Sequence, residues 1–242
     1  MVVTVVAVET AAAMVAMEAA MADHARVAMV AGATGLVGRE ILAALLADKS
    51  VKTVHSVGRR KIDLKHPKLV QHVVDFANLK DLPPVDDVLI ALGTTIKVAG
   101  SQAAFRAVDF EAVVALARAA RVRGAIHLGV VSAMGASAKS PIFYNQVKGE
   151  MEEAVSALGY ASVSIAQPSM LAGDRASLDQ PLRSGERLAL SVTRWLKPLI
   201  PANYQSVQAN DVAAGLLHAV RAGQPGVHRV LSSALQGASQ HN

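Results

Sequence analysis

Cysteine is absent from this chain of 242 residues, and aromatic side chains make up only 3% of it. The first absence excludes disulfides, thiolate metal sites and a cysteine nucleophile, and it predicts a reducing compartment, the cytoplasm. The second leaves few platforms on which single strands could stack, so we expect no nucleic-acid partner despite a net charge of +5. The eight histidines have no His-x-His or His-Glu-x-x-His spacing, so we expect no metal site.

Basic residues are missing from the start of the chain, where no Lys or Arg precedes Arg26. A secretory signal would carry them, and Glu9 and Glu18 interrupt the apolar runs before they reach the about 20 residues that span a bilayer. We therefore expect no membrane span. Residues 1–24 are interpreted as an extension, either disordered or the product of a misassigned start codon, and a weak amphipathic helix for a partner is the alternative.

Short apolar runs alternate with amphipathic stretches from Arg26 onward, which is typical of β-α units around a parallel sheet buried on both faces. We predict one α/β domain over residues 25–242, a doubly wound parallel sheet in the order 3-2-1-4-5-6 with ligands beyond the carboxyl ends of its strands. The expected strands are 27–31, 54–57, 69–74, 88–92, 125–131 and 162–166, and the expected helices are 36–47, 104–121 and 144–158.

The chain from about residue 182 is expected to form a small substrate cap. It should contain a helix at 188–195 and another at 212–221, the latter capped by Asn210 or Asp211. Its apolar side chains hint at a modest hydrophobic carbonyl substrate, although packing in the core is the plainer interpretation, and three arginines between 183 and 194 could instead meet an anionic group.

A glycine-rich loop follows the first expected strand and reads Gly32-Ala33-Thr34-Gly35-Leu36-Val37-Gly38. Its three glycines would permit the tight turn, the approach of backbone to a pyrophosphate and close packing of the next helix. The helix N-terminus near Leu36 and Val37 would then bind the pyrophosphate, and the Thr34 hydroxyl could add a contact. The loop predicts a dinucleotide cofactor, and the alternative is a tight strand-to-helix turn without a ligand.

The end of the second strand indicates which cofactor is bound, because NAD-binding sites usually place an Asp or Glu there for the ribose 2′-hydroxyl. Arg59 and Arg60 stand there instead, and guanidinium groups pair well with a 2′-phosphate, so NADP(H) is favoured over NAD(H). A solvated basic turn is the alternative. Two further groups of residues follow later strands and are expected to line the cofactor: Asp75 and Phe76 near the adenine, and Leu92, Gly93 and Thr94 along the pyrophosphate and ribose.

Tyr144 and Lys148 are spaced so that they share one face of an expected helix. A tyrosine with an ordinary pKa of about 10 exchanges protons poorly at neutral pH, and we expect the Lys148 charge to lower that pKa. Ser132, at the end of the fifth strand, would donate a hydrogen bond to the same substrate oxygen. The spacing predicts a Ser132, Tyr144 and Lys148 catalytic site, while packing and solvation are the plain alternatives.

With these motifs, residues 27–235 resemble the short-chain dehydrogenase/reductase superfamily, and more closely its atypical branch typified by the HIV Tat-interacting-protein oxidoreductase. The resemblance adds the segment around Gln167-Pro168-Ser169-Met170-Leu171 to the motifs above. It implies a Rossmann fold, NADP bound through the loop and Arg59, contacts of Tyr144 and Lys148 with the cofactor, and Ser169 and Leu171 against the nicotinamide.

The sequence departs from that superfamily in three places. The stretch Val108-Asp109-Phe110-Glu111 stands where many members have an Asn that helps a proton relay, Ala133 replaces a second serine, and Gln167 replaces the usual Arg before Pro168. We therefore predict an NADPH-dependent oxidoreductase that reduces a small carbonyl compound, with a cofactor-binding regulator or scaffold as the alternative and a sugar-nucleotide epimerase as a third. A homodimer is expected from fold analogy alone.

Overall fold

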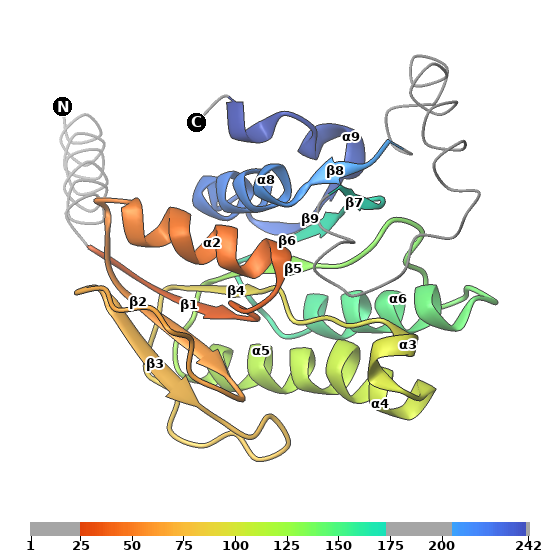
Figure 1. Cartoon of the computed structure of the whole chain (residues 1–242), viewed down its shortest axis with the longest axis horizontal. Helices are drawn as coiled ribbons and strands as arrows, with labels where there is room; N and C mark the ends of the chain where they lie inside the picture. The colour runs from red at the N-terminus through yellow and green to blue at the C-terminus, as the bar shows by residue number, and fades with distance from the viewer. Residues whose placement is uncertain (1–24, 173–204, 241–242) are drawn as a thin grey trace, which may run out of the picture.

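Seven parallel strands form the central sheet of the protein, which is described by a computed structural model over residues 25–172 and 205–240 (Figure 1). Their order is β3-β2-β1-β4-β5-β6-β9. The bounds are β1 Arg26–Ala31, β2 Val51–Gly58, β3 Leu69–Val73, β4 Asp87–Ile90, β5 His127–Val131, β6 Ser162–Gln167 and β9 Gly226–Leu231. The predicted order 3-2-1-4-5-6 is confirmed, and β9 adds a seventh strand that the sequence did not predict.

Helices cover both faces of this sheet. Helix α2 (Leu36–Ala47) and helix α8 (Ala209–Ala222) lie on one face, and helix α5 (Val113–Val122) and helix α6 (Phe143–Ser156) lie on the other (Figure 1). Successive residues of β1 face opposite layers, with Val30 packed under α2 and α8 and Met29 packed under α5 and α6. Burial on both faces explains why the inner strands are continuous apolar runs.

The helix expected at 104–121 is interrupted by a π-helical turn. Helix α4 (Gln102–Arg106) continues through the π-helix η1 (Ala107–Ala112) into α5, and the short helix α3 (Ile96–Ala99) precedes them. The turn contains Asp109, whose side chain is fully buried. Single π-helical turns are rare in proteins, but those that occur often lie at functional sites. This segment is therefore a candidate part of the site.

The carboxyl-terminal part of the chain differs from the prediction at the start of α8. This helix begins at Ala209, and Asn210 and Asp211 lie inside it rather than capping it. Asp211 instead accepts a hydrogen bond from the Ser239 backbone N–H at 3.1 Å, which holds the 3-10 helix η5 (Ala238–Gln240) against α8. The remaining short elements are β7 (Leu171–Ala172), paired in parallel with β8 (Val207–Gln208), and α9 (Ser232–Leu235).

Three predictions fall on residues outside the described ranges. They are the extension over residues 1–24, the helix expected at 188–195 and the first part of the expected cap, from residue 182 to residue 204.

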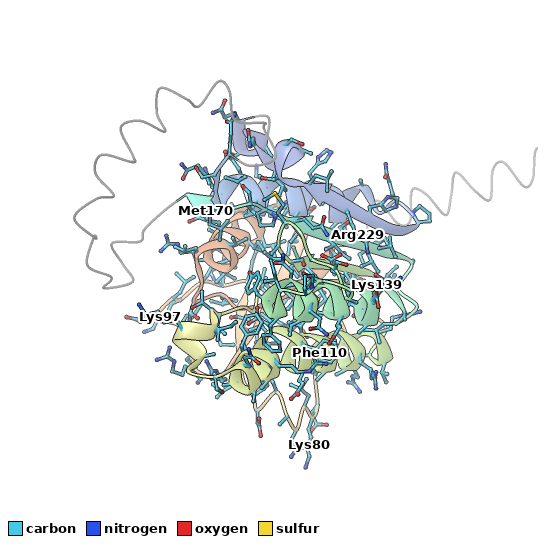
Figure 2. The ribbon with its side chains drawn as sticks, turned by 90° about the vertical axis from the view of Figure 1, so that its right-hand side faces the viewer. Lys80, Lys97, Phe110, Lys139, Met170 and Arg229 are labelled. Atoms are coloured by element: carbon cyan, nitrogen blue, oxygen red, sulfur yellow. The ribbon has the colours of Figure 1, made fainter. Side chains whose placement is uncertain are left out.

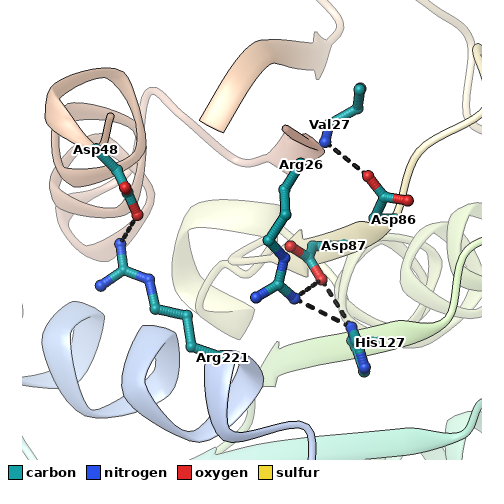
Figure 3. A network of polar contacts seen from close by, with 7 residues as sticks. All are labelled: Arg26, Val27, Asp48, Asp86, Asp87, His127 and Arg221. Carbon is teal, nitrogen blue, oxygen red and sulfur yellow. Dashed lines mark hydrogen bonds and ion pairs between the residues drawn. The ribbon is translucent and has the colours of Figure 1, made fainter. Parts of the chain in front are cut away.

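A polar network ties the amino-terminal ends of the strands together, opposite the end where ligands are expected (Figure 3). The Asp87 carboxylate pairs with the Arg26 guanidinium at 2.5 Å and with Nδ1 of His127 at 2.9 Å, and so joins β1, β4 and β5. An ion pair between Asp48 and Arg221 joins the end of α2 to α8. These contacts fix the sheet at the end remote from the glycine-rich loop.

Candidate cofactor and active site

The glycine-rich loop passes so close to other backbone that side chains are excluded at two of its positions. Gly32 has φ +88°, and a Cβ there would lie 2.4 Å from the Ala91 carbonyl oxygen at the end of β4. A Cβ at Gly38 would lie 2.0 Å from the Gly32 carbonyl oxygen, because α2 packs directly on the loop. The first and third glycines therefore have the turn and packing roles expected of them.

Helix α2 begins just after Gly35 with free backbone N–H groups. Gly35 is the N-cap residue and supplies no side chain, and the first turn holds no acidic residue. The positive end of the helix dipole is thus unopposed by a neighbouring carboxylate, which favours binding of an anion. Val37 and Gly38 are buried within the first turn, and the Val37 side chain packs in the core.

A cavity of about 580 Å³ opens beside this loop and gathers most of the predicted cofactor-binding residues. Its lining includes Gly32, Thr34, Gly35, Arg59, Arg60, Asp75, Phe76, Leu92 and Gly93. The other predicted cofactor-binding residues are not in that lining, namely Leu36, Val37, Gly38, Thr94, Tyr144, Lys148, Ser169 and Leu171. The π turn contributes Ala107, Val108, Glu111 and Ala112 to the lining, a contribution that the sequence analysis missed.

The chemistry of the residues that line the cavity fits the adenosine half of a dinucleotide. Backbone amides of the loop line one side, the side chains of Ile62, Phe76 and Leu92 supply apolar walls, and two guanidinium groups lie at one end. Arg59 and Arg60 are exposed, and neither forms an ion pair with another described residue. Their charge is therefore available to an anionic ligand.

Ser132 lies directly after β5 with its hydroxyl buried. Its backbone N–H donates to the Ala166 carbonyl oxygen at 2.8 Å, while its Oγ finds no hydrogen-bond partner among the described residues. A buried hydroxyl without a partner is uncommon, and it is explained here if the group serves a ligand. The loop after Ser132 packs against α6, because a Cβ at Gly149 would lie 2.1 Å from the Ser137 carbonyl carbon.

Tyr144 and Lys148 occupy the first turns of α6 as predicted. The Tyr144 ring packs on the Phe105 ring of α4 with centroids 5.3 Å apart. The Lys148 ammonium is almost fully buried and lies 2.7 Å from Oδ1 of Asp109. No hydrogen bond joins Ser132, Tyr144 and Lys148 to one another in the part of the chain that the structure describes.

Asp109 connects the buried lysine with the cofactor cavity. Its Oδ2 accepts a hydrogen bond from the Thr94 N–H at 2.9 Å, and a Cβ at Gly93 would lie 3.3 Å from its Oδ1 and 3.7 Å from the Lys148 ammonium. Gly93 therefore borders both the cavity and the ion pair. The sequence analysis marked Asp109 only as part of the stretch that lacks the superfamily's Asn, and it predicted no role for this carboxylate.

The acidity of Tyr144 differs from the prediction. Burial of the phenol, together with the nearby negative charge of Asp109, raises the pKa of Tyr144 to about 12. The expectation that Lys148 lowers this pKa is wrong for the free protein, because the lysine charge is already paired with Asp109. Burial likewise raises the pKa of Asp109, although Lys148 and the Thr94 N–H oppose that shift.

Ser169 forms hydrogen bonds with other residues of the chain, and Leu171 lies in a short strand. The Ser169 hydroxyl donates to the Gln205 carbonyl oxygen and accepts from the Ser232 hydroxyl at 3.0 Å, and Leu171 belongs to β7. Gln167, which stands in place of an Arg, donates from Nε2 to both carboxylate oxygens of Glu152, and Arg229 of β9 donates to the same carboxylate at 2.9 Å. Arg229, labelled in Figure 2, thus brings a guanidinium from the neighbouring strand β9 to this carboxylate.

The glycine-rich loop, the strand order and the Tyr-x-x-x-Lys helix define a protein with the NAD(P)-binding Rossmann fold of short-chain dehydrogenases/reductases. Solved structures support this fold, including a short-chain dehydrogenase family protein from Francisella tularensis, with TM-score 0.63 and 12% identity over 86% of this chain and 98% of that chain. The protein MoeE5 in complex with UDP-glucose and NAD has TM-score 0.60 and 16% identity over 85% of this chain and 75% of that chain. No family model matches the chain.

Curated relatives show the particular family. The mitochondrial protein FMP52 of Candida albicans is 30% identical over 190 residues, which are 75% of this chain and 82% of that protein. Protein HTATIP2 of Rattus norvegicus is 34% identical over 165 residues, 65% of this chain and 66% of that protein. The chain belongs to this FMP52 and HTATIP2 family of atypical short-chain dehydrogenases/reductases, so the predicted resemblance is confirmed.

One prediction is overturned by these relatives. FMP52 proteins from several fungi are named mitochondrial, which contradicts the expectation of a cytoplasmic protein, and the absence of cysteine does not distinguish the two compartments. Within the described ranges, no helix is long and apolar enough to cross a membrane. The same residues contain no cluster of three or more His, Asp or Glu side chains that could hold a metal ion.

Proposed function

We propose that the protein binds NADPH in the 580 Å³ cavity and reduces a small carbonyl compound beside Ser132, Tyr144 and Lys148. The observation that carries this proposal is the position of Gly93, which borders both the cavity and the buried Lys148 ammonium. A cofactor that extends from the arginines past Gly93 would bring its reactive ring toward α6. The Tyr144 ring is partly buried and packs on the Phe105 ring, a setting that suits a neutral carbonyl substrate.

The preference for NADPH follows from the arginines. Arg59 and Arg60 line the cavity at the end of β2, where a carboxylate would otherwise select the ribose 2′-hydroxyl. Asp75 also lines the cavity, but it follows β3 and its carboxylate accepts the Ala77 N–H at 3.0 Å. Its charge is therefore partly engaged by its own turn.

The chain's own groups can perform the proton chemistry of carbonyl reduction. When bound, the dihydronicotinamide supplies the hydride. The unpartnered Ser132 Oγ would donate a hydrogen bond to the substrate oxygen, which orients and polarises the carbonyl group. The Tyr144 phenol would deliver the proton to that oxygen, and Lys148 would stabilise the phenolate that remains.

The experiment that tests the proposal is calorimetric titration of the purified protein with NADPH and with NADH. We expect tighter binding of NADPH, and we expect Arg59→Ala and Arg60→Ala to reduce this preference. Lys52→Ala is the matched control, because it removes an exposed positive charge from the other end of β2. Equal affinities that do not respond to the arginine variants would refute the NADPH preference, and binding of neither cofactor would refute the proposal.

A cofactor-binding regulator is the second candidate, and one observation favours it. Lys148 is paired with Asp109, and the pKa of Tyr144 is about 12, so the free protein is not prepared for rapid proton exchange. Tyr144→Phe distinguishes the two candidates. Loss of carbonyl reduction with unchanged NADPH affinity supports the oxidoreductase, whereas a biological activity that survives the substitution supports the regulator.

A further inference from the structure

Helix α6 carries a buried carboxylate that the proposed proton chemistry does not use. Glu152 is 2% exposed and follows Lys148 by four residues, so Tyr144, Lys148 and Glu152 recur at a spacing that places them on one face of the helix. A carboxylate in the interior is costly unless it is paired and hydrogen-bonded. The partners of Glu152 therefore determine whether α6 can keep its present position.

Two neighbouring strands supply the partners of this carboxylate. Gln167, the last residue of β6, donates from Nε2 to Oε1 of Glu152 at 2.8 Å and to Oε2 at 3.1 Å. Arg229 of β9 donates from Nε to Oε2 at 2.9 Å, and it is the only cation that pairs with Glu152 among the described residues. These three side chains, which we call the clamp, connect α6 to the end of β6 and to the edge strand β9.

Gln167 lies between the two residues of β6 and its extension that hold the loop of Ser132. The Ser132 N–H donates to the Ala166 carbonyl oxygen at 2.8 Å, and the Met134 N–H donates to the Pro168 carbonyl oxygen at 2.9 Å. The Ser132 Oγ has no hydrogen-bond partner among the described residues, so no side-chain hydrogen bond ties the serine to α6. The serine is therefore positioned by β6, the tyrosine and the lysine are positioned by α6, and the clamp joins these two elements.

The positive charge of Arg229 is the part of the clamp that the neutral amide of Gln167 cannot supply. The Arg229 side chain is 47% exposed and the Glu152 side chain 3% exposed, so the arginine reaches a buried carboxylate from the open edge of the sheet. Removing one partner of such a pair leaves an uncompensated charge in the interior, which is strongly unfavourable. A movement of α6 that admits water to the carboxylate would relieve this cost, and it would displace Lys148, which lies one turn away on the same helix.

We propose that Arg229 is a positioning residue that, by pairing with Glu152, holds α6 at the distance from β6 at which the proposed active site is complete. The inference rests on the proposed function, because this site is the one that would receive the carbonyl compound and the nicotinamide half of NADPH. The cavity for the adenosine half lies beyond β1, β2, β3 and β4, and no residue of the clamp lines it. Loosening the clamp should therefore weaken binding of the nicotinamide half and leave binding of the adenosine half unchanged.

The test is calorimetric titration with NADPH and, in parallel, with adenosine 2′,5′-bisphosphate, a fragment that has the adenine and the 2′-phosphate but no nicotinamide. Arg229→Gln should weaken NADPH binding about tenfold, the factor that corresponds to one lost hydrogen bond to a charged group. The affinity for the fragment should not change. A merely structural role of the arginine would affect both ligands alike, so the ratio of the two affinities distinguishes positioning from a general loss of folded protein.

A second substitution should restore the affinity. Gln167→Arg in the Arg229→Gln background returns a guanidinium to the same carboxylate, because the Gln167 side chain already reaches both oxygens of Glu152. The matched control is Arg221→Gln, which removes a 40% exposed arginine from an ion pair at the opposite end of the sheet and should change neither affinity. If Arg229→Gln does not fold, Glu152→Gln replaces it, since that variant leaves no unpaired charge in the interior and should show the same selective loss.

The proposal is overturned if the clamp variant weakens both ligands alike or neither of them, or if Gln167→Arg does not restore NADPH binding. Binding of neither ligand by the unmodified protein would overturn the proposed function and this inference together. The titrations require no turnover, so their outcome is distinguishable from a failure of carbonyl reduction alone.

Discussion

Gly38→Ala is the substitution whose effect follows most directly from the backbone. Gly38 lies in the first turn of α2, and a Cβ there would lie 2.0 Å from the Gly32 carbonyl oxygen and 2.6 Å from its carbon. Both sides of this contact are backbone, so no rotamer change can relieve it. Either the glycine-rich loop or the start of α2 must move.

Two opposing free-energy contributions, helix propensity and overpacking, decide whether this substitution stabilises or destabilises the protein. Alanine gains about 1 kcal/mol over glycine in a helix interior. Overpacking costs about 1–3 kcal/mol, and a backbone-to-backbone clash belongs at the upper end of that range. We therefore expect a net loss of about 2 kcal/mol, which lowers the Tm by about 4–8 °C in a domain of this size.

Urea unfolding followed by circular dichroism measures this loss as a lower midpoint at an unchanged slope. Gly35→Ala is the matched control, because its Cβ would lie 3.3 Å from the same oxygen and Gly35 has the ordinary φ of −86°. We expect its stability to change by less than about 0.5 kcal/mol. A Gly38→Ala protein as stable as the unmodified one would refute the close-packing role of the third glycine.

Two further predictions concern charged and titratable groups away from the site. Asp87→Ala should cost about 2 kcal/mol, because it removes the carboxylate that joins three strands, whereas Asp48→Ala, at a more exposed ion pair, should cost less than about 1 kcal/mol. Thermal unfolding compares the two directly. Burial lowers the pKa of His55 and His72, whose ring nitrogens lie 2.9 Å apart, below the usual 6.5. The unfolded chain then binds protons more readily, so stability should decline as the pH falls from about 6.5 through these lowered values, and His72→Asn should weaken that decline.

The sequence predicted the sheet well because its inner strands are buried on both faces. The apolar runs at the expected strands reflect that burial, and right-handed crossovers then allow a single strand order. Strand β9 was missed because it is an edge strand whose residues are mostly exposed, including Val227 and Leu231, and His228 and Arg229 break the apolar pattern. The predicted start of α8 was wrong because Asp is a residue type that often caps helices, whereas the Asp211 side chain binds Ser239 instead.

The cofactor cavity was predictable for a similar reason. Its lining consists largely of residues that follow successive strands, and parallel strands bring their carboxyl ends to one edge of the sheet. The π turn was not predictable, because 104–121 has helical periodicity throughout and one additional residue in a turn leaves that pattern intact. Its contribution to the cavity wall was missed for that reason.

Asp109 explains why the same sequence pattern can predict the positions of Tyr144 and Lys148 and yet give the wrong acidity for the tyrosine. Spacing of four residues on a helix determines that the two side chains share a face. The effect of the lysine charge depends on what else lies within a few ångströms of it, and that partner comes from another helix, 39 residues earlier in the chain. Gly93 lines the cavity and borders the carboxylate, and the N–H of the next residue, Thr94, donates to it, so a ligand that displaces this loop would also disturb the ion pair. The occupancy of the cavity and the acidity of Tyr144 should therefore be coupled through Asp109.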